Sequence, residues 1–258
     1  MKVSENTAEA PSDLTAWPHR TTPVAPWWHT AILVAVILGI SVLSTLQSRS
    51  AASFSGGHLK RYAITIAWEW ILALIAWWGL RIRRTPVREI LGERRRGAKE
   101  FARDFGIALV FWIIAIVVLA AIGASLRLVH LVHLQRAVLA IAPQTFTQIV
   151  VWLALCATAG MVEEFVFRGY LLQQFASLRI HPNARGSLRT GVIVSSLLFG
   201  AAHGYEGIGG MISITVYGVL FCLLAIHRRS LRAGMIAHAW HDSITGILIA
   251  VAKHAHIF

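Results

Sequence analysis

Three charged residues, Glu163, Glu164 and Arg168, stand close together in a stretch of the chain that is otherwise apolar. The sixteen residues before them, 147–162, carry no charged side chain. A charged side chain inside a bilayer costs roughly 2.5–3.5 kcal/mol on insertion scales, so ionisable residues there indicate a functional site. Residues four positions apart share one face of a helix, whereas neighbours point about 100° apart. The spacing therefore predicts that Arg168 pairs with Glu164 and that Glu163 stays free for chemistry.

Two later segments carry histidines that could act on the same substrate. His203 ends an apolar segment, and His238 precedes Asp242 by four residues, which places both on one helix face. A carboxylate shielded from bulk water can act as a general base toward water. Imidazoles can share that water, bind a metal or stabilise an oxyanion. A glutamate with two histidines also matches a catalytic zinc site with an open position. Either version predicts hydrolysis by an activated water.

Structural explanations exist for each of these groups. A polar network can hold membrane helices together, a histidine at a helix end can be interfacial, and His238 with Asp242 can be a structural pair. Glu69 is an isolated charge in a tryptophan-rich segment, and we interpret it as the partner of a polar group inside the bundle. Because three polar motifs occur on three different apolar segments, we favour a shared functional site.

The composition indicates what kind of element positions these residues. The chain has 258 residues, of which 56% are hydrophobic and 14% charged, and soluble domains carry about 25% charged residues. We predict an all-α, polytopic transmembrane bundle of seven to eight spans of about 20 residues each. The net charge of +12 does not indicate a nucleic-acid partner, because the basic residues lie between apolar segments. Residues 81–103 hold nine of them and are predicted to form a cytoplasmic loop.

The chain divides into three regions. Residues 1–27 are polar and proline-bearing and are predicted to be disordered. Residues 28–146 hold the first transmembrane helices and the basic loop, and residues 147–252 hold the candidate catalytic core. Seven apolar segments are expected, at residues 29–46, 62–80, 105–122, 147–177, 190–202, 211–226 and 233–252.

One stretch leaves the number of crossings open. Residues 126–142 could form an interfacial amphipathic helix or an eighth span. Basic loops follow the second, fourth and sixth segments, and the positive-inside rule places all three in the cytoplasm. Seven crossings then put the amino terminus in the cytoplasm and the carboxyl terminus outside.

The three motifs together resemble a known family. Glu163-Glu164-x-x-x-Arg168, Phe199-x-x-x-His203 and His238-x-x-x-Asp242 are similar to the motifs of the CPBP family of intramembrane endopeptidases. This family is also called Abi or CAAX-protease-like, and its eukaryotic members are the type II CAAX prenyl proteases. The resemblance covers about residues 147–250.

The resemblance implies a role for each motif residue. Glu163 would be the principal catalytic carboxylate that activates water. Glu164 would pair with Arg168 and set the geometry. His203 would polarise or bind the water, and His238 would complete the site.

The resemblance also raises the questions of Asp242 and of a metal. Asp242 stands where the prenyl proteases have an asparagine that is thought to stabilise the oxyanion. An ionised aspartate would repel an oxyanion, so here it would be protonated, orient His238 or ligate a metal. The family is named as metalloproteases. If zinc or another divalent metal is used, Glu163, His203 and His238 would hold it, and the alternative is that no metal is used.

The depth of the motifs in the bilayer gives a geometric test. Glu163 and His203 lie sixteen and fourteen residues from the nearest basic loop, or about 24 and 21 Å along a helix. His238 lies only six residues from its loop, or about 9 Å. If the loops share one side, His238 is about 12 Å too shallow unless a helix is tilted or broken.

The leading hypothesis is an intramembrane endopeptidase in the bacterial cytoplasmic membrane that cleaves a peptide or membrane-protein substrate within the lipid bilayer. One alternative is a non-enzymatic membrane protein, such as a bacteriocin-immunity or scaffold protein. Another is a proton-coupled transporter, which would show an inverted repeat that the sequence lacks.

Overall fold

The computed structural model describes residues 22–49, 57–92, 97–131, 136–178 and 184–255. Within these ranges the regular elements are all helical, which confirms the predicted all-α class. The elements are α1 (Trp27–Arg49), α2 (Gly57–Ile82), α3 (Val87–Leu91), α4 (Ala98–Leu128), α5 (Arg136–Ile141), α6 (Phe146–Glu163), the π-helix η1 (Glu164–Leu171), α7 (Leu172–Ala176), α8 (Ala184–Ala202), the 3₁₀-helix η2 (Gly204–Glu206), α9 (Gly207–Arg228) and α10 (Arg232–His254).

The described residues contain six helices that are long and apolar enough to cross a membrane, and one shorter apolar helix. The protein is therefore an integral multi-pass membrane protein. The six spans are Trp27–Ser48, Gly57–Ile82, Ala98–Leu128, Phe146–Ala176, Gly204–Arg228 and Arg232–His254, and the shorter helix is Ser187–Ala202 in α8. These correspond to the seven segments expected from the sequence.

The ambiguous stretch at residues 126–142 does not supply an eighth span. Its first residues continue α4 as far as Leu128, and α5 has only six residues, or about 9 Å of helix. A span needs about 20 residues. Residues 132–135, between the two helices, lie outside the described ranges.

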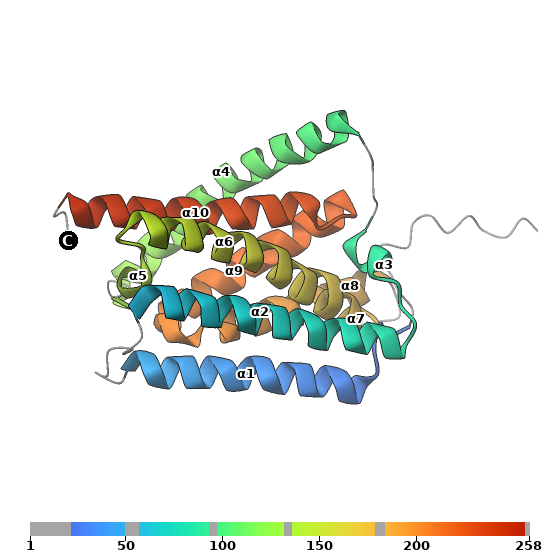
Figure 1. Ribbon diagram of the computed structural model, residues 1–258. Coiled ribbons are helices and arrows are strands. Elements are labelled where there is room, and N and C mark those ends of the chain that lie inside the picture. Colours follow the sequence, from blue (N-terminus) through green and yellow to red (C-terminus); the bar gives the residue numbers. More distant parts are fainter. Residues whose placement is uncertain (1–21, 50–56, 93–96, 132–135, 179–183, 256–258) are drawn as a thin grey trace, which may run out of the picture.

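The helix ends that flank the predicted cytoplasmic loops lie together at one end of the bundle (Figure 1). These are the end of α2, the start of α4, the end of α7, the start of α8 and the turn between α9 and α10. The helix α1 begins at this same end, and α10 finishes at the opposite one. This is the arrangement that seven crossings require.

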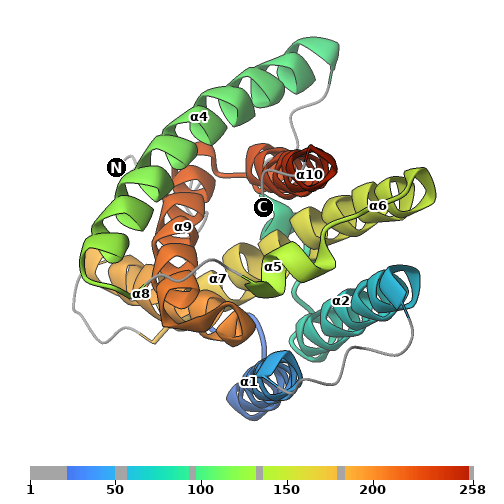
Figure 2. The same ribbon diagram turned by 90° about the vertical axis from the view of Figure 1, so that its left-hand side faces the viewer.

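The span formed by α6, η1 and α7 occupies the middle of the bundle. In its most apolar stretch of 18 residues, 50% of the residues are buried inside the bundle, whereas the corresponding share in α4 is 11%. The helix α4 lies at the edge of the bundle and packs on α9 and α10 (Figure 2). Large side chains on α2 and α4 face outward, for example Trp78 at 59% and Val117 at 64% exposure. Such outward apolar surfaces are expected to face lipid.

The residues just before α1 are packed against α7. Val24 and Ala25 are fully buried, and Gln174 forms two hydrogen bonds with the backbone of Ala25, at 3.1 and 3.0 Å. The hydroxyl of Thr85 donates to the carbonyl oxygen of Val24. The rest of the predicted disordered tail, residues 1–21, lies outside the described residues.

Candidate active site

Glu163 is the last residue of α6, and Glu164 is the first residue of the π-helix η1. A π-helix has i→i+5 hydrogen bonds, is rare, and is frequent at functional sites. The carbonyl oxygen of Phe167 accepts a hydrogen bond from the backbone N–H of Leu172, five residues later, which closes the wide turn of the π-helix. The same oxygen accepts a hydrogen bond from the hydroxyl of Ser195 at 2.6 Å. The serine of α8 thus holds the π segment in place.

The predicted pair of Glu164 and Arg168 is present and buried. Oε1 of Glu164 lies 3.0 Å from an Nη atom of Arg168, and each side chain is 1% exposed. The guanidinium carbon also lies 4.0 Å from the ring centre of Phe199 and 4.9 Å from that of Phe221. Within the described residues, the guanidinium nitrogens have no aligned hydrogen bond. Arg168 is therefore held by the charge of Glu164 and by cation–π contacts.

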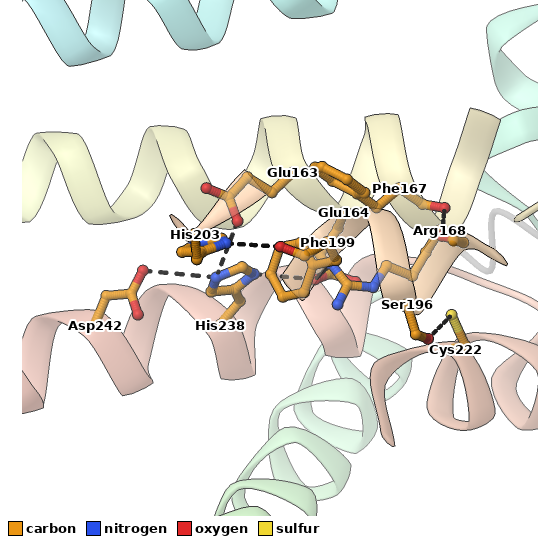
Figure 3. Close-up of polar contacts among 11 residues, drawn as sticks. Glu163, Glu164, Phe167, Arg168, Ser196, Phe199, His203, Cys222, His238 and Asp242 are labelled. Carbon is orange, nitrogen blue, oxygen red and sulfur yellow. Dashed lines mark hydrogen bonds and ion pairs between the residues drawn. The ribbon is translucent and has the colours of Figure 1, made fainter. Parts of the chain in front are cut away.

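His238 on α10 meets all three acidic residues of the motifs (Figure 3). Its Nδ1 is hydrogen-bonded to Oε1 of Glu164 at 3.0 Å. Its Nε2 lies 3.6 Å from Oε2 of Glu163 and 3.6 Å from Oδ2 of Asp242. The ring stacks on Phe221 at 5.1 Å. These contacts fix both the position and the orientation of a buried imidazole.

His203 is anchored through one of its two ring nitrogens. Nδ1 donates to the carbonyl oxygen of Phe199 at 2.8 Å, which leaves Nε2 as an acceptor. The Phe199 ring packs edge-on against His203 and His238, with centroid distances of 4.9 and 6.0 Å. Figure 3 shows His203 and the carboxyl group of Glu163 projecting into the same space. The structure thus brings together all six residues predicted for the site.

The expected difference of about 12 Å in depth between Glu163 and His238 is absent, because the two side chains are in contact. The gap was expected only for helices that are neither tilted nor broken. The span of α6 and η1 crosses the bundle obliquely, and its π turns hold more residues per turn than an α-helix (Figure 2).

Two glycines permit the close approach of α6 and η1 to α10. A Cβ atom on Gly160 would lie 2.8 Å from the carbonyl oxygen of Met235 and 2.9 Å from the backbone nitrogen of Ala239. A Cβ atom on Gly234 would lie 3.1 Å from Oε2 of Glu164. Small residues at helix crossings in membranes let backbones approach in this way.

Two aromatic residues and one acidic residue extend the site beyond the sequence prediction. Phe221 contacts both Arg168 and His238, and no motif in the sequence marks it. Phe199 was part of a motif, but its contacts with Arg168 were not predicted. The carboxyl group of Glu69 on α2 interacts electrostatically with those of Glu163 and Asp242. Its isolated charge in an apolar span was the only sequence signal for this position.

Glu163, His203 and His238 were predicted to hold a metal if one is used. In the described part of the chain, no group of three His, Cys, Asp or Glu side chains is placed to hold a metal ion. Nδ1 of His238 is bonded to Glu164, and Nδ1 of His203 to a backbone carbonyl. The use of a divalent metal by Glu163, His203 and His238 stays a prediction.

Comparison with protein families agrees with the motifs. Residues 143–244, which include the whole of α6 to α9 and the first half of α10, match the family model described as type II CAAX prenyl endopeptidase Rce1-like. Comparisons with curated proteins and with solved structures found no match. All six predicted site residues fall inside the matched segment. The segment that carries the site is therefore similar to the Rce1-like family of CAAX-protease-type intramembrane endopeptidases.

Proposed function

We propose that the protein is an intramembrane endopeptidase that hydrolyses a peptide bond with a water activated by Glu163 and His203. The observation that carries the proposal is the contact of His238 with both glutamates inside the family-matched segment. The hydrogen bond between His238 and Glu164 joins residues 74 positions apart, and Arg168 pairs with Glu164.

Glu163 would act as the general base. Its Oε2 is buried, and no described residue forms a hydrogen bond with it. The carboxylate would take a proton from water while Nε2 of His203 accepts the second O–H, and the resulting hydroxide would attack the scissile carbonyl. Glu163 would then pass the proton to the leaving amine, so the proton count balances.

His238 would stabilise the oxyanion that forms on the scissile carbonyl. Nδ1 donates to Glu164, and a proton on Nε2 would point into the space that Glu163 borders. Asp242 lies 3.6 Å from the same nitrogen and its side chain is 33% exposed, more than those of the other acidic motif residues. Of the roles predicted for Asp242, its position supports that of orienting His238.

The substrate would be a peptide or membrane-protein segment that enters from the lipid bilayer. The protein would reside in the bacterial cytoplasmic membrane with the basic end of the bundle in the cytoplasm. The family name refers to prenylated CAAX proteins. A prenylated peptide is therefore included among the candidate substrates.

The test is cleavage of labelled candidate peptides by the purified protein in lipid vesicles. Glu163→Ala, His203→Ala and His238→Ala are expected to abolish cleavage while keeping the helical content and melting temperature of a folded protein. Cleavage by these folded variants at the wild-type rate would contradict the proposal.

A chelator added to the same assay tests the metal. Loss of activity that zinc or another divalent ion restores would support a metal held by Glu163, His203 and His238. Unchanged activity would support a site that works with protein groups and water.

A further inference from the structure

His203 lies in the break between α8 and η2, where the chain leaves one helix and enters the next. Its backbone angles, φ −102° and ψ 30°, belong to neither helix. The last carbonyl groups of a helix have no partner within it and must bond to other groups. Because the imidazole is attached at this break, the groups that hold the break also decide where Nε2 of His203 lies.

Most of the described bonds at this break are local. The backbone N–H of His203 donates to the carbonyl oxygen of Gly200 at 3.1 Å, and the N–H of Glu206 donates to that of His203 at 3.0 Å. Two further groups, the carbonyl oxygen of Ala201 and the N–H of Gly204, bond to another helix instead. These two groups lie on either side of His203 in the chain.

A single hydroxyl group on α1 bonds to both of them. Oγ of Ser41 donates to the carbonyl oxygen of Ala201 at 2.5 Å and accepts the N–H of Gly204 at 3.3 Å. Ser41 is buried, and a buried backbone group that loses its partner is costly. The hydroxyl therefore holds the chain both before and after the imidazole.

The turn after His203 also fits closely against α1, which packs on both η2 and α8. A Cβ atom on Gly204 would lie 2.7 Å from Oγ1 of Thr45 and 3.0 Å from Oγ of Ser41. The hydroxyl of Thr45 donates to the carbonyl oxygen of Ser41 at 2.7 Å, so it is held in place within α1. The turn can therefore approach Ser41 closely because residue 204 has no side chain.

We infer that Ser41 is a positioning residue for His203, and the inference rests on the proposed function. Its hydroxyl fixes the break between α8 and η2, and the break directs Nε2 of His203 toward the water that Glu163 activates. Ser41 acts through His203 and touches neither the water nor the substrate. The family-matched segment begins at residue 143, so this role belongs to a helix outside that segment.

Substitutions in α1 and in the turn test this role in the cleavage assay. Ser41→Ala removes both hydrogen bonds. A misplacement of about 1 Å can slow a catalysed step by about 10²-fold, so kcat should fall by about 10- to 10²-fold with little change in KM. Gly204→Ala displaces the same turn from its other side and should cause the same kind of loss.

The matched control is Ser44→Ala. The hydroxyl of Ser44 donates to the carbonyl oxygen of Ser41 within α1 at 2.9 Å, so its removal should leave kcat unchanged. Wild-type kcat in the folded Ser41→Ala and Gly204→Ala variants would overturn the inference. A lower melting temperature with wild-type kcat would also overturn it, because Ser41 would then serve stability alone.

The ring of His203 reports its own position without any substrate. In protein that carries isotope-labelled histidine, the NMR signals of this ring are assigned by their absence from His203→Gln. Ser41→Ala should shift these signals, and Ser44→Ala should not. If they shift but the natural chain cleaves no peptide, the proposed function fails and Ser41 still positions His203. If the signals and kcat of Ser41→Ala match the wild type, the inference fails and the endopeptidase stands.

Discussion

Glu163 and Glu164 are adjacent in the chain and have different surroundings. Glu164 is buried against Arg168 and accepts a hydrogen bond from His238. Glu163 faces His238 at 3.6 Å and keeps a buried oxygen without a described hydrogen bond. A carboxylate whose charge is already compensated is a poor base. We therefore assign a structural role to Glu164 and the role of general base to Glu163.

Substitution of Glu163 should affect catalysis far more than folding. Glu163→Gln keeps the shape of the side chain but cannot take a proton from water, so kcat should fall by about 10²–10⁴-fold. The rate of peptide cleavage and the melting temperature of the same preparation check this. Glu100→Gln serves as the control, and an active Glu163→Gln enzyme would show that another group is the base.

Substitution of Arg168 should affect folding as well as catalysis. Arg168→Leu leaves the Glu164 charge buried without its cation, and breaking a buried pair costs about 3–5 kcal/mol. Unfolding in mixed detergent micelles measures this loss. The matched control is Arg81→Leu, because Arg81 is exposed at the end of α2 and should change stability little. Equal stability of the two variants would mean that the pair does not stabilise the fold.

At the scale of the elements, the crossing of α6 over α10 brings the two halves of the site together. Gly160 lies where the backbone of α6 comes close to that of α10, and η1 begins four residues later. The π-helix and the oblique crossing place Glu163 and Glu164 against His238, although simple helix arithmetic separates them in depth. A regular α6 parallel to α10 would keep the motifs apart.

Adding a single methyl group should disturb this crossing. In Gly160→Ala the new Cβ atom would lie 2.8 Å from a backbone carbonyl oxygen of α10, so the helices must move apart. Overpacking of this kind costs about 1–3 kcal/mol, and cleavage should fall because His238 shifts relative to Glu163. Gly106→Ala is the control, since a Cβ atom there meets nothing within 4 Å. Thermal unfolding and cleavage rates of the two variants test this prediction. Equal stability and equal cleavage in Gly160→Ala and Gly106→Ala would contradict it.

At the scale of the whole molecule, the orientation in the membrane follows from the gathering of basic helix ends. Arg81 lies in the last turn of α2, Lys99 in the first turn of α4 and Arg229 directly after α9. These helix ends lie together at one end of the bundle (Figure 1). Asp104 is paired at the same end with Arg228 at 2.8 Å and with Arg232 at 3.2 Å, which ties α4 to the turn between α9 and α10. The predicted cytoplasmic side is therefore also a fixed structural end of the bundle.

This orientation predicts which positions are accessible from each side. A single cysteine at Arg88, in a chain without Cys156 and Cys222, should react with an impermeant thiol reagent only after the cells are opened. A cysteine at His254 should react in intact cells, because α10 ends at the opposite side. The reverse labelling pattern would contradict the assignment of the basic end to the cytoplasm.

The sequence alone was enough to predict the class of fold and to select six polar residues that the structure brings together. Long apolar runs with few charges determine membrane helices, because an unpaired backbone polar group is costly in lipid. The charges that interrupt those runs marked Glu163, Glu164 and Arg168, and the i, i+4 spacing correctly predicted the pair of Glu164 with Arg168. These features can be predicted because each depends on the spacing of residues within a single helix.

Only the tertiary structure decided how these residues meet. Several features depend on which helix faces pack against one another. They are the π-helix η1, the contact at Gly160, and the packing of Phe199 and Phe221 around Arg168 and His238. The electrostatic interaction of Glu69 with Glu163 likewise joins helices far apart in the chain. Helix tilt, crossing and rotation arise from packing between segments, and no spacing along one segment reports them.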